Sequence, residues 1–374
     1  MHTQTKFRLL VVRLGAMGDI LHALPAVTAL RLAHPGWVID WVVEPRWRAL
    51  LAAGGPAEGQ LNPARPIVDR LHLAASKDWR RAPFSSQTLH EIRSLRQALK
   101  QGDYDTVIDF QGAIRSAVVG RLAGCQRLIG EARPRERAAS WLYTERVETE
   151  GAHVIEQDVE LAAAIAGDEL QPVSPWLPID AAAKAWANEI LPATSPRTAL
   201  INPGAGWGAK RWPVERYAAV AQGLMERGMK VLVNAGPGEE ALAEEIVQVA
   251  SGAIALTCTL EQLIALTRRV SLAIAGDTGP LHLACALGRP VVGIYGPTDP
   301  RRNGPFGTRF RVLRSPESVR DHSRHEAPEA GLLTIEPEEV LRAADELLRD
   351  KLPSDHLPSH HLPSDVWPSE ESST

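Results

Sequence analysis

The sequence predicts an α/β protein of two successive halves, each a parallel sheet covered by helices, which face each other across a cleft. The chain of 374 residues is longer than one hydrophobic core usually organises. Short β-branched apolar runs alternate with longer helical patterns, as they do where helices connect parallel strands. The alternation stops in a proline-rich stretch at residues 168–198 and then starts again. Two α/β domains of similar size therefore follow one another along the chain.

The first domain is expected at residues 1–175. Its first strand is the apolar run at 7–12, and the periodic segment at 20–33 is a helix that ends at the His-Pro-Gly sequence of residues 34–36. The remaining elements show the same two patterns: strands at 38–43 and 106–109 and a helix at 91–100.

A linker is expected at 176–197 and the second domain at 198–349, with a last helix that can pack back on the first domain. Residues 350–374 repeat an LPS triplet and have no apolar face, so we expect a disordered tail. In the linker and the second domain the predicted elements are helices at 181–190, 213–227, 239–250 and from 280 onward, and strands at 198–202, 230–234, 271–275 and 291–295.

The composition argues against several classes of protein. A formal net charge of −4 is unlike that of a general nucleic-acid binder, and no apolar stretch approaches the roughly 20 residues of a membrane-spanning helix. The three cysteines lie far apart without a CxxC pair, which indicates reduced core residues. The tail histidines His356, His360 and His361 fit a solvated segment better than a metal site. We expect a cytoplasmic protein without a metal that can still touch a membrane surface.

The stretch AIAGDTGPLHLACA places Asp277, Thr278 and His282 where a strand passes into a helix. Pro280 suits the first helical position, and Thr278 or Asp277 suits the cap. The carboxyl edge of a parallel sheet, at a helix start, is where α/β proteins bind phosphate groups. The amides expected to be free for such a ligand are those of Thr278, Gly279, Leu281 and His282. The alternative is that Asp-Thr-Gly only caps the helix.

Another glycine turn, RLGAMGD, follows the first strand and ends in Asp19. Its G-x-x-G spacing fits neither the dinucleotide fingerprint nor a P-loop. The helix dipole stabilises a carboxylate at this place as the anion, which makes it available as a base but unfavourable for phosphate. We therefore do not expect the first domain to hold a nucleotide. The alternative role of Asp19 is to cap its own helix.

Two more glycine turns follow strands of the second domain. The loop NPGAGWGAKRWP carries Lys210 and Arg211 behind flexible glycines such as Gly206, and it can bring a cation to a diphosphate. The turn NAGPGEE carries Glu239, whose carboxylate could accept hydrogen bonds from ribose hydroxyls. The alternatives are a surface loop with solvated cations and a glutamate that stabilises its own helix.

Basic residues gather in two segments of the first domain, LAASKDWRRAPF and GEARPRERAASW, although the chain as a whole is acidic. Local positive charge in an acidic protein fits an anionic partner. The alternative is a solvated helix face. The candidate residues for binding the partner are Arg80, Arg81, Arg133 and Arg135.

Six motifs in order resemble the ADP-heptose:lipopolysaccharide heptosyltransferases, type I more than type II: RLGAMGDILHALPAV, WVVEPRW, DTVIDFQGAIRSA, NPGAGWGAKRWP, GDTGPLHLACALGRP and YGPTDPRRNGPFG. The resemblance covers residues 7–348. It implies a GT-B fold of two Rossmann-like domains, the first for the acceptor and the second for the nucleotide sugar. It also implies an inverting, metal-independent transfer of L-glycero-D-manno-heptose from ADP-heptose to the Kdo of Kdo2-lipid A, by a monomer on the cytoplasmic face of the inner membrane.

The same resemblance implies roles for single residues. Asp19 matches the family's proposed catalytic base, Lys210 its diphosphate lysine and Glu239 its ribose-side carboxylate. The arginines of the two basic segments would face Kdo carboxylates and lipid A phosphates. The donor-binding residues are Gly206, Lys210, Glu239, Asp277, Thr278, Gly279 and His282.

Other functions remain open at this point. The loop GAGWGA is closer to type II members, which add the second heptose, whereas GPTDP and WVVEP favour type I. A nucleotide-sugar epimerase of the same fold would need no basic acceptor face, and a non-catalytic sensor of the nucleotide sugar would tolerate the loss of Asp19. An NAD-dependent oxidoreductase would need a GxGxxG turn, which the first turn lacks.

Overall fold

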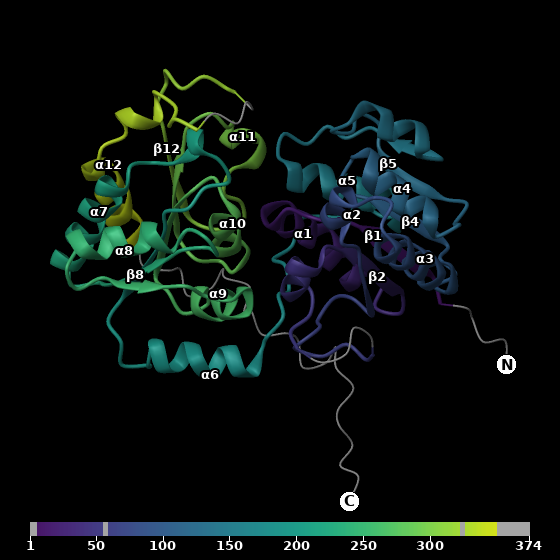
Figure 1. Ribbon diagram of the computed structural model, residues 1–374, viewed down its shortest axis with the longest axis horizontal. Coiled ribbons are helices and arrows are strands. Elements are labelled where there is room, and N and C mark those ends of the chain that lie inside the picture. The colour runs from purple at the N-terminus through teal and green to yellow at the C-terminus, as the bar shows by residue number, and fades with distance from the viewer. Residues whose placement is uncertain (1–5, 55–58, 322–325, 350–374) are drawn as a thin grey trace, which may run out of the picture. The chain divides into compact units, whose positions relative to one another are not determined.

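The computed structural model describes residues 6–54, 59–321 and 326–349 and divides the chain between Ile179 and Asp180 into two compact units (Figure 1). The boundary falls inside the stretch predicted as a linker, and helix α6 (Ala181–Ile190) of that stretch packs on α9 (Leu260–Thr267) of the second unit. The predicted tail at 350–374, with its three histidines, lies outside the described residues.

The first unit is built on a parallel six-stranded sheet with the order β3-β2-β1-β4-β5-β6. This order reverses between β1 and β4, and at such a reversal parallel sheets form their binding crevice, at the carboxyl edge between the turns that follow the two strands. The strands are β1 (Arg8–Val12), β2 (Val38–Val43), β3 (Arg70–Leu73), β4 (Thr106–Asp109), β5 (Leu128–Glu131) and β6 (Glu145–Val147). The helices are α1 (Met17–Ala33), α2 (Ser76–Arg81), α3 (Ser86–Gln101), α4 (Ile114–Leu122) and α5 (Val154–Ala166), with 3₁₀ turns η1 (Pro45–Leu50) and η2 (Arg137–Leu142).

The second unit repeats this topology in a sheet of order β12-β11-β10-β7-β8-β9, which reverses between β7 and β10. The two sheets confirm the predicted fold class of two Rossmann-like units. The strands are β7 (Thr198–Asn202), β8 (Lys230–Asn234), β9 (Ile254–Leu256), β10 (Leu272–Gly276), β11 (Val291–Tyr295) and β12 (Phe310–Arg314). The further helices are α7 (Val214–Glu226), α8 (Glu240–Val249), α10 (Gly279–Ala286), α11 (Pro300–Asn303) and α12 (Pro337–Arg349), with 3₁₀ turns η3 (Gly208–Lys210) and η4 (Leu332–Thr334).

Alternate residues of the second sheet bury against different helices. Ile274 and its neighbours on one face belong to a large core with α7, α8 and α12, whereas Ala273 and Ala275 on the other face pack with α10 (Figure 1). Strands buried on both faces read as continuous apolar runs, which is why the sequence predicted them well. The last helix, for which packing on the first domain was considered, buries Val340 and Ala344 in this second core.

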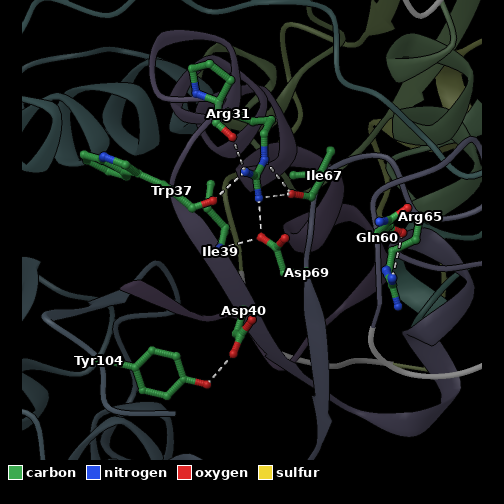
Figure 2. Close-up of polar contacts among 10 residues, drawn as sticks. Arg31, Trp37, Ile39, Asp40, Gln60, Arg65, Ile67, Asp69 and Tyr104 are labelled. Atoms are coloured by element: carbon green, nitrogen blue, oxygen red, sulfur yellow. Dashed lines mark hydrogen bonds and ion pairs between the residues drawn. The ribbon is translucent and has the colours of Figure 1, made fainter. Parts of the chain in front are cut away.

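A buried polar network holds the first unit together on the side of β2 and β3. The guanidinium of Arg31 donates to the main-chain oxygens of Ile67 and Trp37 and lies 2.6 Å from a carboxylate oxygen of Asp69 (Figure 2). Nearby, the hydroxyl of Tyr104 donates to Asp40 Oδ2 over 2.7 Å. Arg31 thus ties α1 to the loop before β3, and Tyr104 ties the segment before β4 to β2.

Replacing Tyr104 by Phe is expected to destabilise the protein by about 1–3 kcal/mol, because the buried carboxylate of Asp40 loses its donor. Asp40 is 1% exposed, and no hydrogen bond to its other oxygen is recorded within the described residues. Urea unfolding of both proteins measures the difference. A Gln60→Ala variant is the control: Gln60 accepts from Arg65 only through its main-chain oxygen (Figure 2), so its free energy of unfolding should change by less than about 0.5 kcal/mol. Equal stabilities of Tyr104→Phe and the parent would contradict the role of this hydrogen bond.

Candidate functional site

The crevice of the second unit brings Lys210 and Asp277 together. Lys210 ends η3, in the loop after β7, and Asp277 follows β10 directly, so the two side chains come from the two strands at which the order reverses. Lys210 Nζ lies 2.5 Å from Asp277 Oδ2, and the two side chains are 10% and 8% exposed. The glycine loop thus places its cation beside the Asp-Thr-Gly turn, as the sequence predicted.

His282 completes this cluster from the first turn of α10. Its Nε2 lies 3.2 Å from Asp277 Oδ1, so each oxygen of the carboxylate has one partner. Burial by itself would raise the pKa of Asp277, but the hydrogen bond with His282 and the charge of Lys210 hold that pKa well below its usual range. The lowered pKa favours the ionised form of Asp277, which forms an ion pair with Lys210.

The start of α10 differs from the prediction in two respects. The helix begins at Gly279, so Pro280 is its second residue and not its first. The amides of Leu281 and His282, which were expected to be free, donate to the main-chain oxygen of Thr278 over 3.1 and 3.3 Å. This happens because Thr278 holds the extended cap position, from which its oxygen accepts the first bonds of the helix. Of the four predicted amides, those of Thr278 and Gly279 make no hydrogen bond to the described part of the chain and remain for a ligand.

Glu239 lies at the cap position of α8, next to the end of β7. A Cβ added to Gly204 would lie 2.0 Å from Glu239 Oε2, so the carboxylate lies directly against the main chain of this loop. Arg211 NH2 lies 3.8 Å from Glu239 Oε1. Gly206, by contrast, has open space where a Cβ would be. The glycine of this loop that lies against Glu239 is therefore Gly204, which sequence reasoning did not single out.

Two further contacts restrain the Lys210 loop, and neither was predicted. The ammonium of Lys210 lies 4.3 Å from the centre of the Trp207 ring, a cation–π geometry. The amide of Glu329 donates to the main-chain oxygen of Ala209, and a Cβ on Gly208 would collide with the main-chain oxygen of Glu326. No sequence pattern connects this loop with Glu326 and Glu329, more than 100 positions later. The tryptophan within the glycine-rich loop was the only sequence signal for a contact with Lys210.

Asp19 lies in the first turn of α1, which begins at Met17, three residues earlier than predicted. Its Oδ2 accepts from the amide of Ala16 over 3.0 Å, and its Oδ1 lies 3.3 Å from Arg13 NH2. The side chain is 38% exposed, so the carboxylate is anchored on one side and open to solvent on the other. Its place after β1 is at the crevice of the first sheet.

One group of basic residues in the first unit lies around Lys77. Lys77 of α2 has a pKa lowered by burial and by the charges of Arg46, Arg115 and Arg80. These four cations follow β2, β3 and β4, at the same carboxyl edge as Asp19. Arg46 and Arg115 were not predicted; their positions just after strands were the available signal.

The other predicted arginines are less concentrated. Arg81 lies 3.6 Å from Asp78, and Arg133 lies 3.1 Å from Glu148, in exposed pairs. The main chain of Arg135 approaches Gly112 at the end of β4, where a Cβ would lie 3.0 Å from the Arg135 nitrogen.

The described residues contain neither a candidate metal site nor a candidate membrane-spanning helix. No group of three or more His, Cys, Asp or Glu side chains in residues 6–54, 59–321 and 326–349 is arranged to hold a metal ion. Over the same residues, no helix is both long and apolar enough to cross a membrane.

Comparison with known proteins gives consistent matches. The model of glycosyltransferase family 9 (heptosyltransferase) matches residues 92–332. Lipopolysaccharide heptosyltransferase 1 of Escherichia coli K12 is 31% identical over 320 residues, which cover 83% of this chain and 94% of that protein. Structures of E. coli heptosyltransferase WaaC with ADP and with ADP-2-deoxy-2-fluoro heptose are 28% identical, with TM-scores of 0.75 and 0.73, and cover 91% of this chain and 100% and 99% of theirs. Lipopolysaccharide heptosyltransferase 2 of E. coli K12 is 26% identical over 361 residues, 91% of this chain and 98% of that protein.

Proposed function

Because this chain belongs to glycosyltransferase family 9, the heptosyltransferases, we propose that it transfers L-glycero-D-manno-heptose from ADP-heptose to the Kdo of Kdo2-lipid A, with inversion at the anomeric carbon. The observation that carries the proposal is the Lys210–Asp277–His282 cluster at the crevice of the second sheet. A protein similar to this chain has been solved with ADP and with an analogue of ADP-heptose. The enzyme class, a glycosyltransferase, follows from the family itself.

The donor would bind at the second unit. The diphosphate draws the ammonium of Lys210 from Asp277 and accepts hydrogen bonds from the amides of Thr278 and Gly279 at the start of α10. These groups are set in place before the reaction, so they stabilise the negative charge that develops on the departing ADP. The carboxylate of Glu239 would accept hydrogen bonds from ribose hydroxyls. In this proposal cationic side chains and amides supply the charge, and no metal takes part.

The acceptor would bind at the first unit. Asp19 removes the proton from the acceptor hydroxyl as its oxygen attacks the anomeric carbon, and the bond from that carbon to the ADP oxygen breaks in the same displacement. Lys77, Arg80 and the neighbouring cations attract the anionic acceptor, and Arg81, Arg133 and Arg135 extend the positive surface. We place this reaction at the cytoplasmic face of the inner membrane, carried out by a monomer.

A second candidate is the transfer of the second heptose. The glycine-rich loop that carries Lys210 favours it, because that loop is closer to type II members, and the E. coli type II enzyme is 26% identical to this chain. The higher identity to the type I enzyme, 31%, favours the first transfer.

The proposal is tested by incubating the purified protein with ADP-heptose and Kdo2-lipid A in EDTA and following ADP release and the mass of the lipid. A gain of one heptose supports the proposed function. Transfer only to an acceptor that already carries heptose would assign the second step instead. Binding of ADP without transfer to either acceptor would contradict both acceptor assignments, and only the donor-site assignment would remain supported.

Replacing Trp207 by Leu is expected to raise the Kd for ADP about 2- to 10-fold, because the aromatic face next to the Lys210 ammonium is lost. Trp207→Phe should have a smaller effect, since it retains a ring. Isothermal titration of ADP measures both. Trp141→Leu is the matched control, as that indole is 77% exposed in the first unit. An unchanged Kd for Trp207→Leu would show that the ring does not contribute to donor binding.

A further inference from the structure

The turn that carries Asp19 is built around a buried arginine. Arg13 directly follows β1, and its side chain is 8% exposed. Its NH1 donates to the main-chain oxygen of Phe110 at the end of β4, and its NH2 lies 3.3 Å from Asp19 Oδ1. The main-chain oxygen of Arg13 accepts from the indole of Trp41 over 3.0 Å. Both the main chain and the side chain of Arg13 are therefore held in place. The guanidinium bridges the ends of β1 and β4, the two strands at which the sheet order reverses.

A second carboxylate lies on the inner side of Arg13. Asp109 ends β4 and is 1% exposed. Burial raises its pKa, against the lowering effects of hydrogen bonds from the Gln111 amide, Ser116 and Tyr143 and of the charge of Arg13. Arg13 therefore interacts electrostatically with the buried carboxylate of Asp109 and forms an ion pair with the half-exposed Asp19.

Gln111 holds the other side of the same turn. Its Oε1 accepts from the amide of Leu14, the residue after Arg13, over 2.8 Å. Arg13 Nε and Gln111 Nε2 are buried, and no hydrogen-bond partner is recorded for either within the described residues. A buried donor without a partner costs about 1–3 kcal/mol. The unpaired donors therefore lower the stability of the fold. Such a cost is typical of side chains whose exact placement serves function.

We propose that Arg13 is a positioning residue for Asp19; this rests on the proposed function, in which Asp19 accepts the proton. The amide of Ala16 donates to Asp19 Oδ2, and the guanidinium of Arg13 forms an ion pair with Oδ1, so the two contacts fix the orientation of the carboxylate. A base in a single orientation takes the proton from a bound hydroxyl without first rearranging. Arginine suits this position because two separate nitrogens reach Phe110 and Asp19 at once, whereas lysine offers one.

Four variants test the proposal: Arg13→Met, Arg13→Lys, Asp19→Asn and the double variant Arg13→Met/Asp19→Asn. We expect Arg13→Met to lower kcat about 100-fold, as a misplaced catalytic group does, with an unchanged KM for ADP-heptose because the donor loops lie in the other unit. Arg13→Lys should recover part of the loss. The double variant should be no slower than Asp19→Asn alone, within about 3-fold, because the two residues act as one unit.

Arg8→Met is the matched control. Arg8 lies at the other end of β1 and donates to the main-chain oxygen of Gly102, so its loss removes a guanidinium from the same strand without touching Asp19. Its kcat should stay within about 2-fold of the parent. Thermal unfolding of every variant separates lost folding from lost activity, and Arg13→Lys keeps the test valid if Arg13→Met does not fold.

The outcomes separate the two hypotheses. A normal kcat for Arg13→Met, or losses that multiply in the double variant, would overturn the positioning role of Arg13 while leaving Asp19 as the base. A normal kcat for Asp19→Asn would instead overturn the base assignment in the proposed function. A slow Asp19→Asn together with a double variant of the same rate is the result that we expect.

Discussion

Replacing Asp19 by Asn should lower kcat for heptose transfer by about 10²- to 10⁴-fold, the usual contribution of a general base. Asn has nearly the same shape as Asp, but its amide does not accept the proton of the acceptor hydroxyl. The KM for ADP-heptose should stay unchanged, because the donor cluster of Lys210 and Asp277 lies in the other unit. Initial rates of ADP release at saturating acceptor measure the effect.

Asp168→Asn is the control for this prediction. Asp168 is an exposed carboxylate of the same unit, so its loss changes the net charge equally and should leave kcat within about 2-fold. Unchanged product formation by Asp19→Asn would contradict its role as base. It would fit a protein that binds the nucleotide sugar for another purpose.

Lys210→Met should lower kcat/KM by about 10²- to 10³-fold, as the loss of one preorganised charge-stabilising group does. The variant also leaves Asp277 as a buried anion facing the diphosphate. Breaking a buried ion pair from one side costs about 3–5 kcal/mol, and the side chains of this pair are 10% and 8% exposed. We therefore expect a lower melting temperature as well, measured by scanning calorimetry beside the kinetics.

The double variant Lys210→Met/Asp277→Asn separates charge repulsion from the loss of the cation. Removing the unpaired anion should restore part of the affinity for ADP but not the rate, because no cation remains to stabilise the leaving group. Lys184→Met, at an exposed lysine of α6, is the control and should match the parent in both. If Lys210→Met keeps its kcat/KM, the ammonium does not stabilise the departing diphosphate.

Buried parallel strands were the part of the fold that the sequence predicted best. The predicted bounds of β2, β4, β7, β8 and β11 agree with the structure, because each is rich in β-branched or other apolar residues and lies between polar turns. The strands β3, β5, β6, β9 and β12 were not predicted. β3 reads RLHL and β6 reads ERV, so polar residues interrupt their apolar patterns. β3, β6, β9 and β12 lie at sheet edges, where one side of the strand has no neighbour. Hydrogen bonds to the neighbouring strand, and not a pattern in their own residues, determine that these segments are strands.

The candidate site was predictable where it depends on strand ends. Lys210 and Asp277 could be placed together from sequence because the carboxyl ends of parallel strands share one edge. The contacts of Arg13 with Phe110 and Asp19 could not, because side-chain burial depends on packing across the sheet. At the start of α10 the cap itself was predicted correctly, but one consequence of it was missed. The main-chain oxygen of the cap residue, Thr278, accepts from the amide of Leu281, which was expected to be free.

The ion pair of Lys210 and Asp277 has a consequence for selectivity. Without substrate, the cation at the sheet crevice is already matched by an anion of the protein itself. A small monovalent anion gains little there, because it must compete with a carboxylate that is fixed in place. A diphosphate brings several charges and can also bind the helix amides at the same time. If the donor binds here as proposed, this pairing should favour a ligand that carries several charges over the common monovalent anions.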